Sequence, residues 1–284
     1  MSEISKVGVV GCGLMGSGIA EVAARAGLDV IVREANDELV ERGAARVRSS
    51  LERAVKSGKL SEEELGATWG RLHFTSDLAA LAGREIVIEA IAEHEPTKVA
   101  LFAELDRLLP EGAIIASNTS SIPIIRLGAA TARPEHVLGM HFFNPVPVLP
   151  LLELVVSVRS DPAVVERAAA FGAGQLKKSV IRSKDRSGFI VNALLVPFLL
   201  SAIRMLESGF ASAEDIDVGL EKGCAHPMGP LRLCDLIGLD TMKLVADSLY
   251  EEFKEPLYAA PPLLLRMVEA GWHGRKTGRG FYTY

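Results

Sequence analysis

The sequence predicts an α/β fold, a doubly wound and mostly parallel sheet covered by helices, followed by an all-helical C-terminal domain. From Lys6 to about Arg182, short apolar runs rich in β-branched residues alternate with helical patterns. A glycine-rich turn joins the first apolar run to the first helical pattern, as expected where a strand passes into a helix. From Ser187 to the C-terminus, helix-length segments separated by Gly and Pro recur without a further convincing strand.

The predicted strands have the apolar character of parallel strands that are buried on both faces. They comprise residues 7–10, 29–33, 71–75, 85–90, 113–117, 136–140, 151–156 and 178–182. Gly and Pro bound the predicted helices of the C-terminal part. These helices comprise residues 188–208, 212–223, 230–254 and 261–270. We therefore expect a sheet domain over residues 1–185 and a helical domain over residues 186–284.

The connection between the second and third predicted strands, residues 34–70, is too long for the single short helix of a minimal βαβ unit. Ser61 and Glu64 form an S-x-x-E capping box just after a break at Gly58. We therefore expect an inserted helical hairpin over about residues 37–70.

Composition and charge argue against several classes of protein. The chain of 284 residues is 49% hydrophobic, and its formal net charge of −5 argues against an extended surface for nucleic acid. The longest apolar stretch, residues 189–203, is interrupted by Asn192 and Pro197 and is too short to span a membrane. The three cysteines lack the spacing of a disulfide framework or a zinc site, so we expect reduced thiols and no metal. No signal peptide is recognised in residues 1–6, which favours a cytoplasmic location.

Residues 11–16 read GCGLMG and directly follow the first predicted strand. In a G-x-G-x-x-G turn the first glycine permits the tight turn, the second lets the backbone approach a pyrophosphate, and the third lets helix and strand pack closely. The phosphates then lie at a helix N-terminus, so this pattern predicts a Rossmann-type dinucleotide site. The alternative is a glycine turn that binds nothing. The loop residues expected to contact the cofactor are Gly11, Gly13, Leu14, Met15 and Gly16.

The acid that ends the second predicted strand, Glu34, lies where a ribose-binding carboxylate is expected. It would accept hydrogen bonds from the adenosine ribose hydroxyls and repel a 2′-phosphate, which favours NAD over NADP. The neighbouring Arg33 complicates this interpretation, because a guanidinium there could reach a 2′-phosphate. Arg33 could equally be a solvated charge at the strand end, so some use of NADP stays open.

Two polar segments that follow predicted strands carry candidates for acid–base chemistry. Ser120 lies in ASNTSS and His141 in GMHFFNPV, and both segments should lie at the carboxyl edge of the sheet, where open α/β sheets bind ligands. An imidazole held by a carboxylate suits the removal of a hydroxyl proton near neutral pH, and Glu153 on the next strand is the natural partner of His141. The alternatives are a core histidine bonded to the backbone and a serine that caps a strand end.

Motifs along the whole chain resemble the 3-hydroxyacyl-CoA dehydrogenase family, most closely its bacterial, actinobacterial-type 3-hydroxybutyryl-CoA dehydrogenases. The motifs that carry the resemblance are GCGLMGSGIAEVAARAG (11–27), VIEAIAE (87–93), ASNTSSIPI (116–124), GMHFFNPVPVLPLLELV (139–155), DRSGFIVNALLVPFL (185–199), HPMGPLRLCDLIGLDT (226–241) and GRKTGRGFYTY (274–284). The resemblance implies reversible, NAD-dependent oxidation of an (S)-3-hydroxyacyl-CoA, with 3-hydroxybutyryl-CoA favoured, and a place in fatty acid or butanoate metabolism.

The resemblance also implies roles for individual residues. His141 matches the family's catalytic histidine, Glu153 its orienting carboxylate, and Ser120 the serine that hydrogen-bonds the substrate oxygen and the cofactor. Asn192 matches an asparagine that holds the reacting or thioester oxygen. An unpartnered amide in the apolar run FIVNALLVPFL would be costly, so Asn192 must find partners in the core or face a site.

Further residues are expected to contact NAD only because of their motif context. They match cofactor-contacting positions of the family and are Glu93, Lys98, Asn144 and Lys276. Of these, Asn144 is expected near the nicotinamide, and Lys276 is expected to reach the cofactor from the helical domain. Each would otherwise be interpreted as an ordinary surface residue.

The predicted hairpin carries a local excess of positive charge in an acidic protein. Its basic residues are Arg46, Arg48, Arg53, Lys56 and Lys59, with Glu52 between them. Arg46, Arg53 and Lys56 lie near one helix face, which could grip the phosphates of coenzyme A or could be a solvated face. Because the family places coenzyme A against this hairpin, we expect Arg53, Lys56 and Lys59 to bind substrate, although Ser57 replaces a lysine common in clostridial members.

Two rival functions remain. A related hydroxyacid or sugar-acid dehydrogenase would not need coenzyme A, although the glycine-rich helix start with a catalytic lysine that is common in hydroxyacid enzymes is not found. A non-catalytic, crystallin-like NAD-binding protein is disfavoured by the intact set of Ser120, His141, Glu153 and Asn192.

The helical domain has more apolar side chains than one small bundle needs. They are Leu194, Leu195, Phe198, Leu199, Ile203 and Leu206. We therefore expect a homodimer that forms through this domain, as the family resemblance also implies.

Overall fold

The structure, a computed structural model, describes residues 3–284. Residues 1 and 2, which belong to the segment where no signal peptide was recognised, lie outside the described residues. The chain divides into two compact units, residues 1–186 and residues 187–284. Each unit is described by itself.

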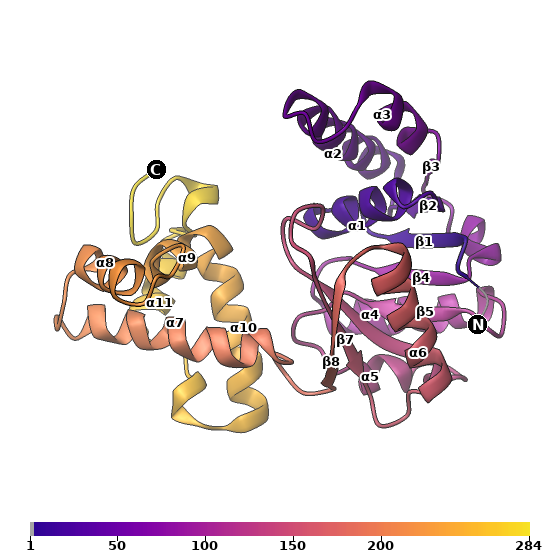
Figure 1. Ribbon diagram of the computed structural model, residues 1–284. Helices are drawn as coiled ribbons and strands as arrows, with labels where there is room; N and C mark the ends of the chain where they lie inside the picture. The colour runs from indigo at the N-terminus through magenta and orange to yellow at the C-terminus, as the bar shows by residue number, and fades with distance from the viewer. Residues whose placement is uncertain (1–2) are drawn as a thin grey trace. The chain divides into compact units, whose positions relative to one another are not determined.

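An eight-stranded sheet forms the centre of the first unit, with the strand order β3-β2-β1-β4-β5-β6-β7-β8 (Figure 1). Its strands are β1 (Lys6–Val10), β2 (Asp29–Arg33), β3 (Leu72–Thr75), β4 (Ile86–Glu89), β5 (Ile114–Ser117), β6 (Val137–Phe142), β7 (Leu151–Val156) and β8 (Ser179–Lys184). All neighbouring strands run parallel except β6 and β7, which pair antiparallel. The predicted, mostly parallel α/β fold is therefore confirmed.

Helices pack against this sheet and extend from it. They are α1 (Leu14–Arg25), α2 (Asp37–Lys56), α3 (Glu62–Trp69), α4 (Glu95–Leu108), α5 (Ile124–Gly128) and α6 (Pro162–Ala170). Shorter helical turns lie at η1 (Leu78–Gly83), η2 (Pro134–His136) and η3 (Phe171–Gln175). The core between sheet and helices is apolar, and side chains such as Val9, Ile19 and Ile88 are fully buried. Burial of each such side chain stabilises the unit by about 1.5–3 kcal/mol.

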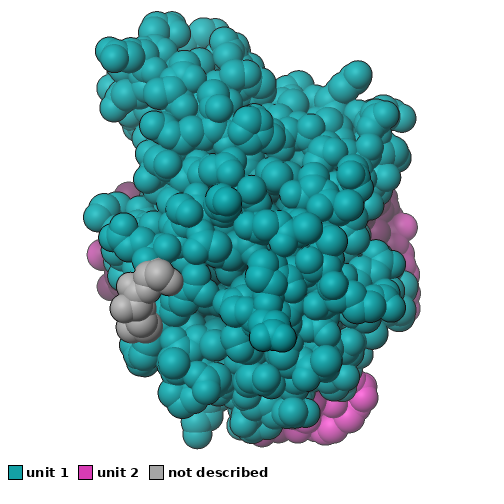
Figure 2. Space-filling model, turned by 90° about the vertical axis from the view of Figure 1, so that its right-hand side faces the viewer, with its two compact units in different colours: residues 1–186 teal, residues 187–284 magenta. Residues whose placement is uncertain are grey.

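Helices α2 and α3 form the expected hairpin, a lobe at the top of the first unit (Figures 1 and 2). Asn36 caps the start of α2 by accepting a hydrogen bond from the Leu39 N–H at 2.9 Å. The predicted capping box starts α3, because Ser61 Oγ accepts the Glu64 N–H at 3.1 Å and the Glu64 carboxylate accepts the Ser61 N–H at 2.7 Å.

The second unit is helical throughout its described elements. They are α7 (Val191–Glu207), α8 (Ala213–Gly223), α9 (Pro230–Ile237), α10 (Leu239–Phe253) and α11 (Pro262–Glu269), with short turns at η4 (Pro256–Tyr258) and η5 (Arg275–Thr277). The prediction of one helix over residues 230–254 is wrong, because Gly238 separates α9 from α10. Gly238 has φ = 101°, a conformation that ends a helix and that glycine adopts without steric cost.

A shared apolar core holds these helices together, and Leu199, Ile203, Leu231 and Ala246 are fully buried in it. Across residues 3–284, every helix is too short or too polar to cross a membrane.

Candidate active site

His141 and Glu153 are direct partners across the antiparallel strands β6 and β7. The His141 Nδ1 atom lies 2.7 Å from the Glu153 Oε2 atom, and the two residues are 4% and 0% exposed. A carboxylate at Nδ1 orients the imidazole ring, so its second nitrogen, Nε2, points away from the pair. The register of this strand pair therefore creates the predicted histidine–carboxylate pair.

Ser120 completes a chain of three side chains with this pair. It lies in the loop after β5, and its Oγ atom is 3.0 Å from His141 Nε2. Ser120 is only half-buried, unlike His141, so the Nε2 end of the chain is the more accessible one. Because β5 and β6 are parallel, Ser120 and His141 both lie at the carboxyl edge of the sheet. This arrangement can exchange a proton with a hydroxyl group placed beside Ser120 and His141.

Glu93, expected to contact the cofactor, binds the loop that carries Ser120. Its Oε1 atom accepts the Ser120 N–H at 3.1 Å and the Ser121 hydroxyl at 2.9 Å, and it also accepts the Thr119 hydroxyl. Burial alone would raise the pKa of Glu93, but the charge of Lys98 and the hydrogen bonds from Thr119 and Ser121 outweigh it and lower the pKa. Glu93 is therefore an anion that fixes the conformation of the Ser120 loop.

Lys98 is 1% exposed and lies between two carboxylates. Its Nζ atom is 2.6 Å from Glu89 Oε1 and 3.1 Å from Glu93 Oε2. The fully buried Glu89 also accepts hydrogen bonds from Ser117 Oγ at 2.6 Å and from the Ile91 N–H at 2.7 Å. These contacts satisfy the buried charges, and the expected contact of Lys98 with NAD stays a prediction.

Sequence reasoning did not assign Glu89 or Asn118 to the site. Asn118 Oδ1 accepts the Phe142 N–H at 2.9 Å and thereby ties the end of β5 to the end of β6. The signal for Glu89 was present, because a carboxylate in an otherwise apolar strand requires a buried partner. Only the folded chain shows that this partner is Lys98 in α4.

The glycine-rich turn has the steric properties that a dinucleotide requires. Gly11 has φ = 91°, and a Cβ atom at Gly16 would lie 1.8 Å from the Gly11 carbonyl oxygen, so neither position tolerates a side chain. A Cβ atom at Gly13 would instead have no heavy atom within 4 Å, which leaves open space beside the backbone. Leu14, which begins α1, is 64% exposed, and Met15 is half-buried. The turn therefore fits a pyrophosphate held against the N-terminus of α1.

Glu34 lies at the end of β2 beside this turn. Its Oε1 atom accepts the Cys12 N–H at 2.5 Å, and its Oε2 atom accepts the Ala35 N–H at 3.1 Å. Arg33 is half-buried and donates from Nε to the Ser76 carbonyl oxygen at 3.4 Å. The carboxylate of Glu34 is thus held next to the turn, where an adenosine ribose would lie.

The basic residues of the hairpin make different contacts. Arg53 and Lys59 line a cavity of about 490 Å³, which we call the hairpin cavity. Arg46 instead donates to the Cys12 carbonyl oxygen at 2.7 Å, and Arg48 pairs with Glu52. Lys56 is exposed and is not part of the cavity lining.

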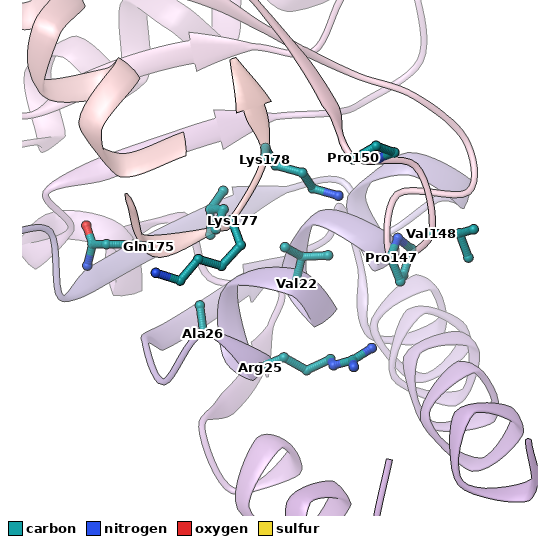
Figure 3. Close-up of a pocket in the computed structure, with 10 residues that line it drawn as sticks. Val22, Arg25, Ala26, Pro147, Val148, Pro150, Gln175, Lys177 and Lys178 are labelled. Carbon is teal, nitrogen blue, oxygen red and sulfur yellow. The ribbon is translucent and has the colours of Figure 1, made fainter. Parts of the chain in front are cut away.

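A neighbouring cavity of about 370 Å³ shares Arg25, Pro147 and Val148 with the hairpin cavity (Figure 3). At its edge, the buried Lys178 donates from Nζ to the main-chain oxygens of Val146 and Leu149 at 2.6 and 2.7 Å. Desolvation lowers the pKa of Lys178. This lysine holds the connection between β6 and β7, which also contains the exposed Asn144.

Sequence profiles of two domains together cover nearly the whole chain. Residues 6–186 match the profile described as "3-hydroxyacyl-CoA dehydrogenase, NAD binding domain" and residues 188–284 that described as "3-hydroxyacyl-CoA dehydrogenase, C-terminal domain". The chain belongs to the 3-hydroxyacyl-CoA dehydrogenase family. The resemblance stated from the motifs is thereby confirmed.

Relatives of this 3-hydroxyacyl-CoA dehydrogenase family member match it over nearly their full lengths. The chain is 59% identical to 3-hydroxybutyryl-CoA dehydrogenase of Mycobacterium tuberculosis over 282 residues, 99% of each chain. It is 38% identical to human mitochondrial hydroxyacyl-coenzyme A dehydrogenase over 99% of this chain and 91% of the relative. The crystal structure of M. tuberculosis FadB2 superposes with a TM-score of 0.99 over 100% of both chains at 59% identity. That of (S)-3-hydroxybutyryl-CoA dehydrogenase from Ralstonia eutropha gives 0.94 over 99% of both chains at 44% identity.

Two expected site residues lie in the second unit of this family member. Asn192 is the second residue of α7 and is half-buried. Lys276 lies in the turn η5, where its Nζ atom is 2.6 Å from Asp240 Oδ2. Their roles toward substrate and cofactor stay predictions.

Proposed function

We propose that the protein oxidises the C3 hydroxyl of an (S)-3-hydroxyacyl-CoA to the 3-keto thioester with NAD, and catalyses the reverse reaction with NADH. The observation that most directly supports this reaction is the hydrogen-bonded chain Ser120–His141–Glu153 at the carboxyl edge of the sheet. The glycine-rich turn after β1 lies at this same edge, because β1, β4, β5 and β6 are parallel neighbours. The names of the bacterial relatives favour the four-carbon substrate, 3-hydroxybutyryl-CoA.

In this mechanism the side chains of the protein accept the proton of the substrate hydroxyl and stabilise the positive charge that results. His141 Nε2 accepts the proton of the C3 hydroxyl, and Ser120 Oγ orients the substrate oxygen beside it. The carboxylate of Glu153 stabilises the imidazolium that forms at His141. NAD, when bound, supplies the acceptor for the hydride that leaves C3. Asn192 is proposed to hold the reacting or thioester oxygen, as its motif implies.

For the coenzyme A portion, we propose that the hairpin cavity binds its phosphates. Three cations, Arg25, Arg53 and Lys59, and one carboxylate, Glu21, line this cavity, so its lining carries a net positive charge in a chain of net charge −5. Lys56 is exposed on the same hairpin, where it can add a longer-range attraction. Substitution of Arg53 and Lys59 by Met should raise KM for the thioester and leave the affinity for NADH unchanged.

For the cofactor, we propose that Glu34 selects NAD over NADP by accepting hydrogen bonds from the ribose hydroxyls and repelling a 2′-phosphate. The proposed contacts from the rest of the chain are Glu93, Lys98, Asn144 and Lys276. A comparison of KM values for NADH and NADPH tests the selectivity. Equal values would assign the adjacent Arg33 to a 2′-phosphate and remove the selective role of Glu34.

We further propose a homodimer that forms through the second unit, in the cytoplasm. Several apolar side chains of this unit are exposed, including Leu194 at 72% and Phe210 at 80%. The free cysteines Cys12, Cys224 and Cys234 are consistent with a reducing compartment. Sedimentation analysis of the wild type and of Leu194→Lys tests the assembly. A wild-type monomer would contradict it.

The reaction is tested by following the absorbance of NADH with acetoacetyl-CoA as substrate, and again with free acetoacetate. Turnover of the thioester alone supports the proposal. Equal turnover of both substrates would indicate a hydroxyacid dehydrogenase that does not need coenzyme A. Binding of NADH without turnover of either would indicate a different substrate or a non-catalytic protein.

A further inference from the structure

Cys12, the second residue of the glycine-rich turn, is held through both of its main-chain polar groups. Its N–H donates to Glu34 Oε1 at 2.5 Å, and its carbonyl oxygen accepts from Arg46 Nη1 at 2.7 Å. Glu34 comes from the end of β2, whereas Arg46 comes from the middle of α2. Two opposite charges, from two different parts of the chain, therefore fix the two peptide groups on either side of the Cys12 Cα atom.

The backbone of α2 also packs directly on Cys12. Gly43 is buried, and a Cβ atom there would lie 2.6 Å from Cys12 Cβ and 2.8 Å from its Sγ. Arg46 follows Gly43 by three residues, which places both on the same helix face. The hairpin thus rests on the turn through Gly43, and the guanidinium of Arg46 binds the turn beside that contact.

The thiol of Cys12 contributes to this packing as an apolar group. The side chain is 2% exposed, and desolvation together with the charge of Glu34 raises its pKa to about 12, although the charge of Arg46 acts in the opposite direction. A neutral thiol packs as a small apolar side chain, so the polar attachment of the turn to α2 at Cys12 is made by Arg46.

We propose that Arg46 is a positioning residue of the cofactor site, which holds the glycine-rich turn in the conformation that binds the pyrophosphate of NAD. The helical spacing of Arg46, Arg53 and Lys56 is compatible with phosphate binding or with a solvated face, but the Arg46 guanidinium binds the turn, whereas Arg53 lines the hairpin cavity. Arg46 therefore governs affinity for the dinucleotide, and Arg53 governs affinity for the thioester. This inference rests on the proposed function only in that the turn binds NAD.

The test compares Arg46→Met with Arg46→Lys, Arg53→Met and Arg42→Met. Arg42 is the matched control, because it lies one turn earlier on α2, its side chain is 65% exposed, and it reaches Glu38 only at 4.0 Å. The dissociation constant of NADH is measured by fluorescence titration without thioester, and KM for acetoacetyl-CoA is measured separately.

Arg46→Met should weaken NADH binding roughly tenfold, because the turn is no longer held in the binding conformation, with KM for the thioester unchanged. The lost hydrogen bond is made within the folded chain, so the melting temperature should fall by only a few degrees. Arg46→Lys should recover part of the NADH affinity, because its ammonium can donate to the same carbonyl oxygen. Arg53→Met should raise KM for the thioester and leave the NADH affinity unchanged. Arg42→Met should match the wild type in both quantities.

If Arg46→Met raised KM for the thioester and left the NADH affinity unchanged, the inference would be overturned, and Arg46 would instead be assigned to binding of the coenzyme A phosphates. The inference would also be overturned if Arg46→Met changed neither the NADH affinity nor KM for the thioester. Equal weakening of NADH binding and thioester binding, with a large fall in the melting temperature, would overturn it as well, because that result indicates a general loss of folding. Because NADH binding is measured without thioester, failure of the proposed reaction would leave this result interpretable.

Discussion

His141 on β6 faces Glu153 on the antiparallel neighbouring strand β7, and the His141 Nδ1 atom lies 2.7 Å from the Glu153 Oε2 atom. Both residues are nearly inaccessible, so the carboxylate acts on the imidazole with little screening by water. A change in either partner alters the charge at the reacting nitrogen.

Glu153→Gln should lower kcat by about 10²–10⁴-fold, because an amide cannot stabilise the imidazolium as a carboxylate does. His141→Ala should lower kcat by a comparable factor. The affinity for NADH should change little in either variant, as the glycine-rich turn is intact. Stopped-flow and steady-state assays with acetoacetyl-CoA measure kcat, and Glu166→Gln, an exposed glutamate, is the control. A kcat within threefold of the wild type would remove the pair from the mechanism.

Gly13→Ala should weaken NADH binding roughly tenfold without destabilising the fold, since the added methyl group meets no heavy atom within 4 Å but narrows the approach to the turn. Gly16→Ala should both destabilise the unit and abolish NADH binding, because its methyl group would lie 1.8 Å from the Gly11 oxygen. Fluorescence titration and thermal unfolding separate the two effects. Gly112→Ala, which also has open space, is the control. Wild-type NADH affinity in Gly13→Ala would place the pyrophosphate elsewhere.

Lys98→Met should reduce the free energy of unfolding by about 3–5 kcal/mol, because it leaves the carboxylate of Glu89 buried without its cation. The double variant Lys98→Met with Glu89→Gln should recover part of this loss, since it removes the unpaired charge. Urea unfolding measures both values. Equal destabilisation of the single and double variants would show that packing, not charge, sets the effect.

The contribution of Glu93 to stability should depend on pH. Its folded-state pKa lies below the usual 4.5, so its stabilising effect is fully present above pH 4.5 and is lost as pH falls through the folded-state pKa. The difference in unfolding free energy between the wild type and Glu93→Gln should therefore be constant near neutral pH and shrink below pH 4.5. Urea unfolding across this pH range measures it, and a difference that grows on acidification would contradict the ion pair with Lys98.

Much of the sheet domain could be predicted from short windows of sequence. Apolar runs such as residues 29–33 and the glycine spacing of residues 11–16 specify local backbone conformation and burial, so the strands, the turn and the capped hairpin follow from neighbouring residues. Ser120 and His141 were placed at the carboxyl edge for the same reason: each directly follows or ends a strand.

Most side-chain partners could be known only from the folded chain. The sequence predicted Glu153 as the partner of His141, but their direct contact depends on an antiparallel register between β6 and β7, and neither strand encodes that direction by itself. The same applies to the ion pair of Lys98 with Glu89 and to the contact of Arg46 with Cys12, which separates Arg46 from Arg53 although both lie on α2. Local sequence specifies the conformation of each segment, whereas contacts between segments depend on long-range packing, because many partners are compatible with the same local pattern.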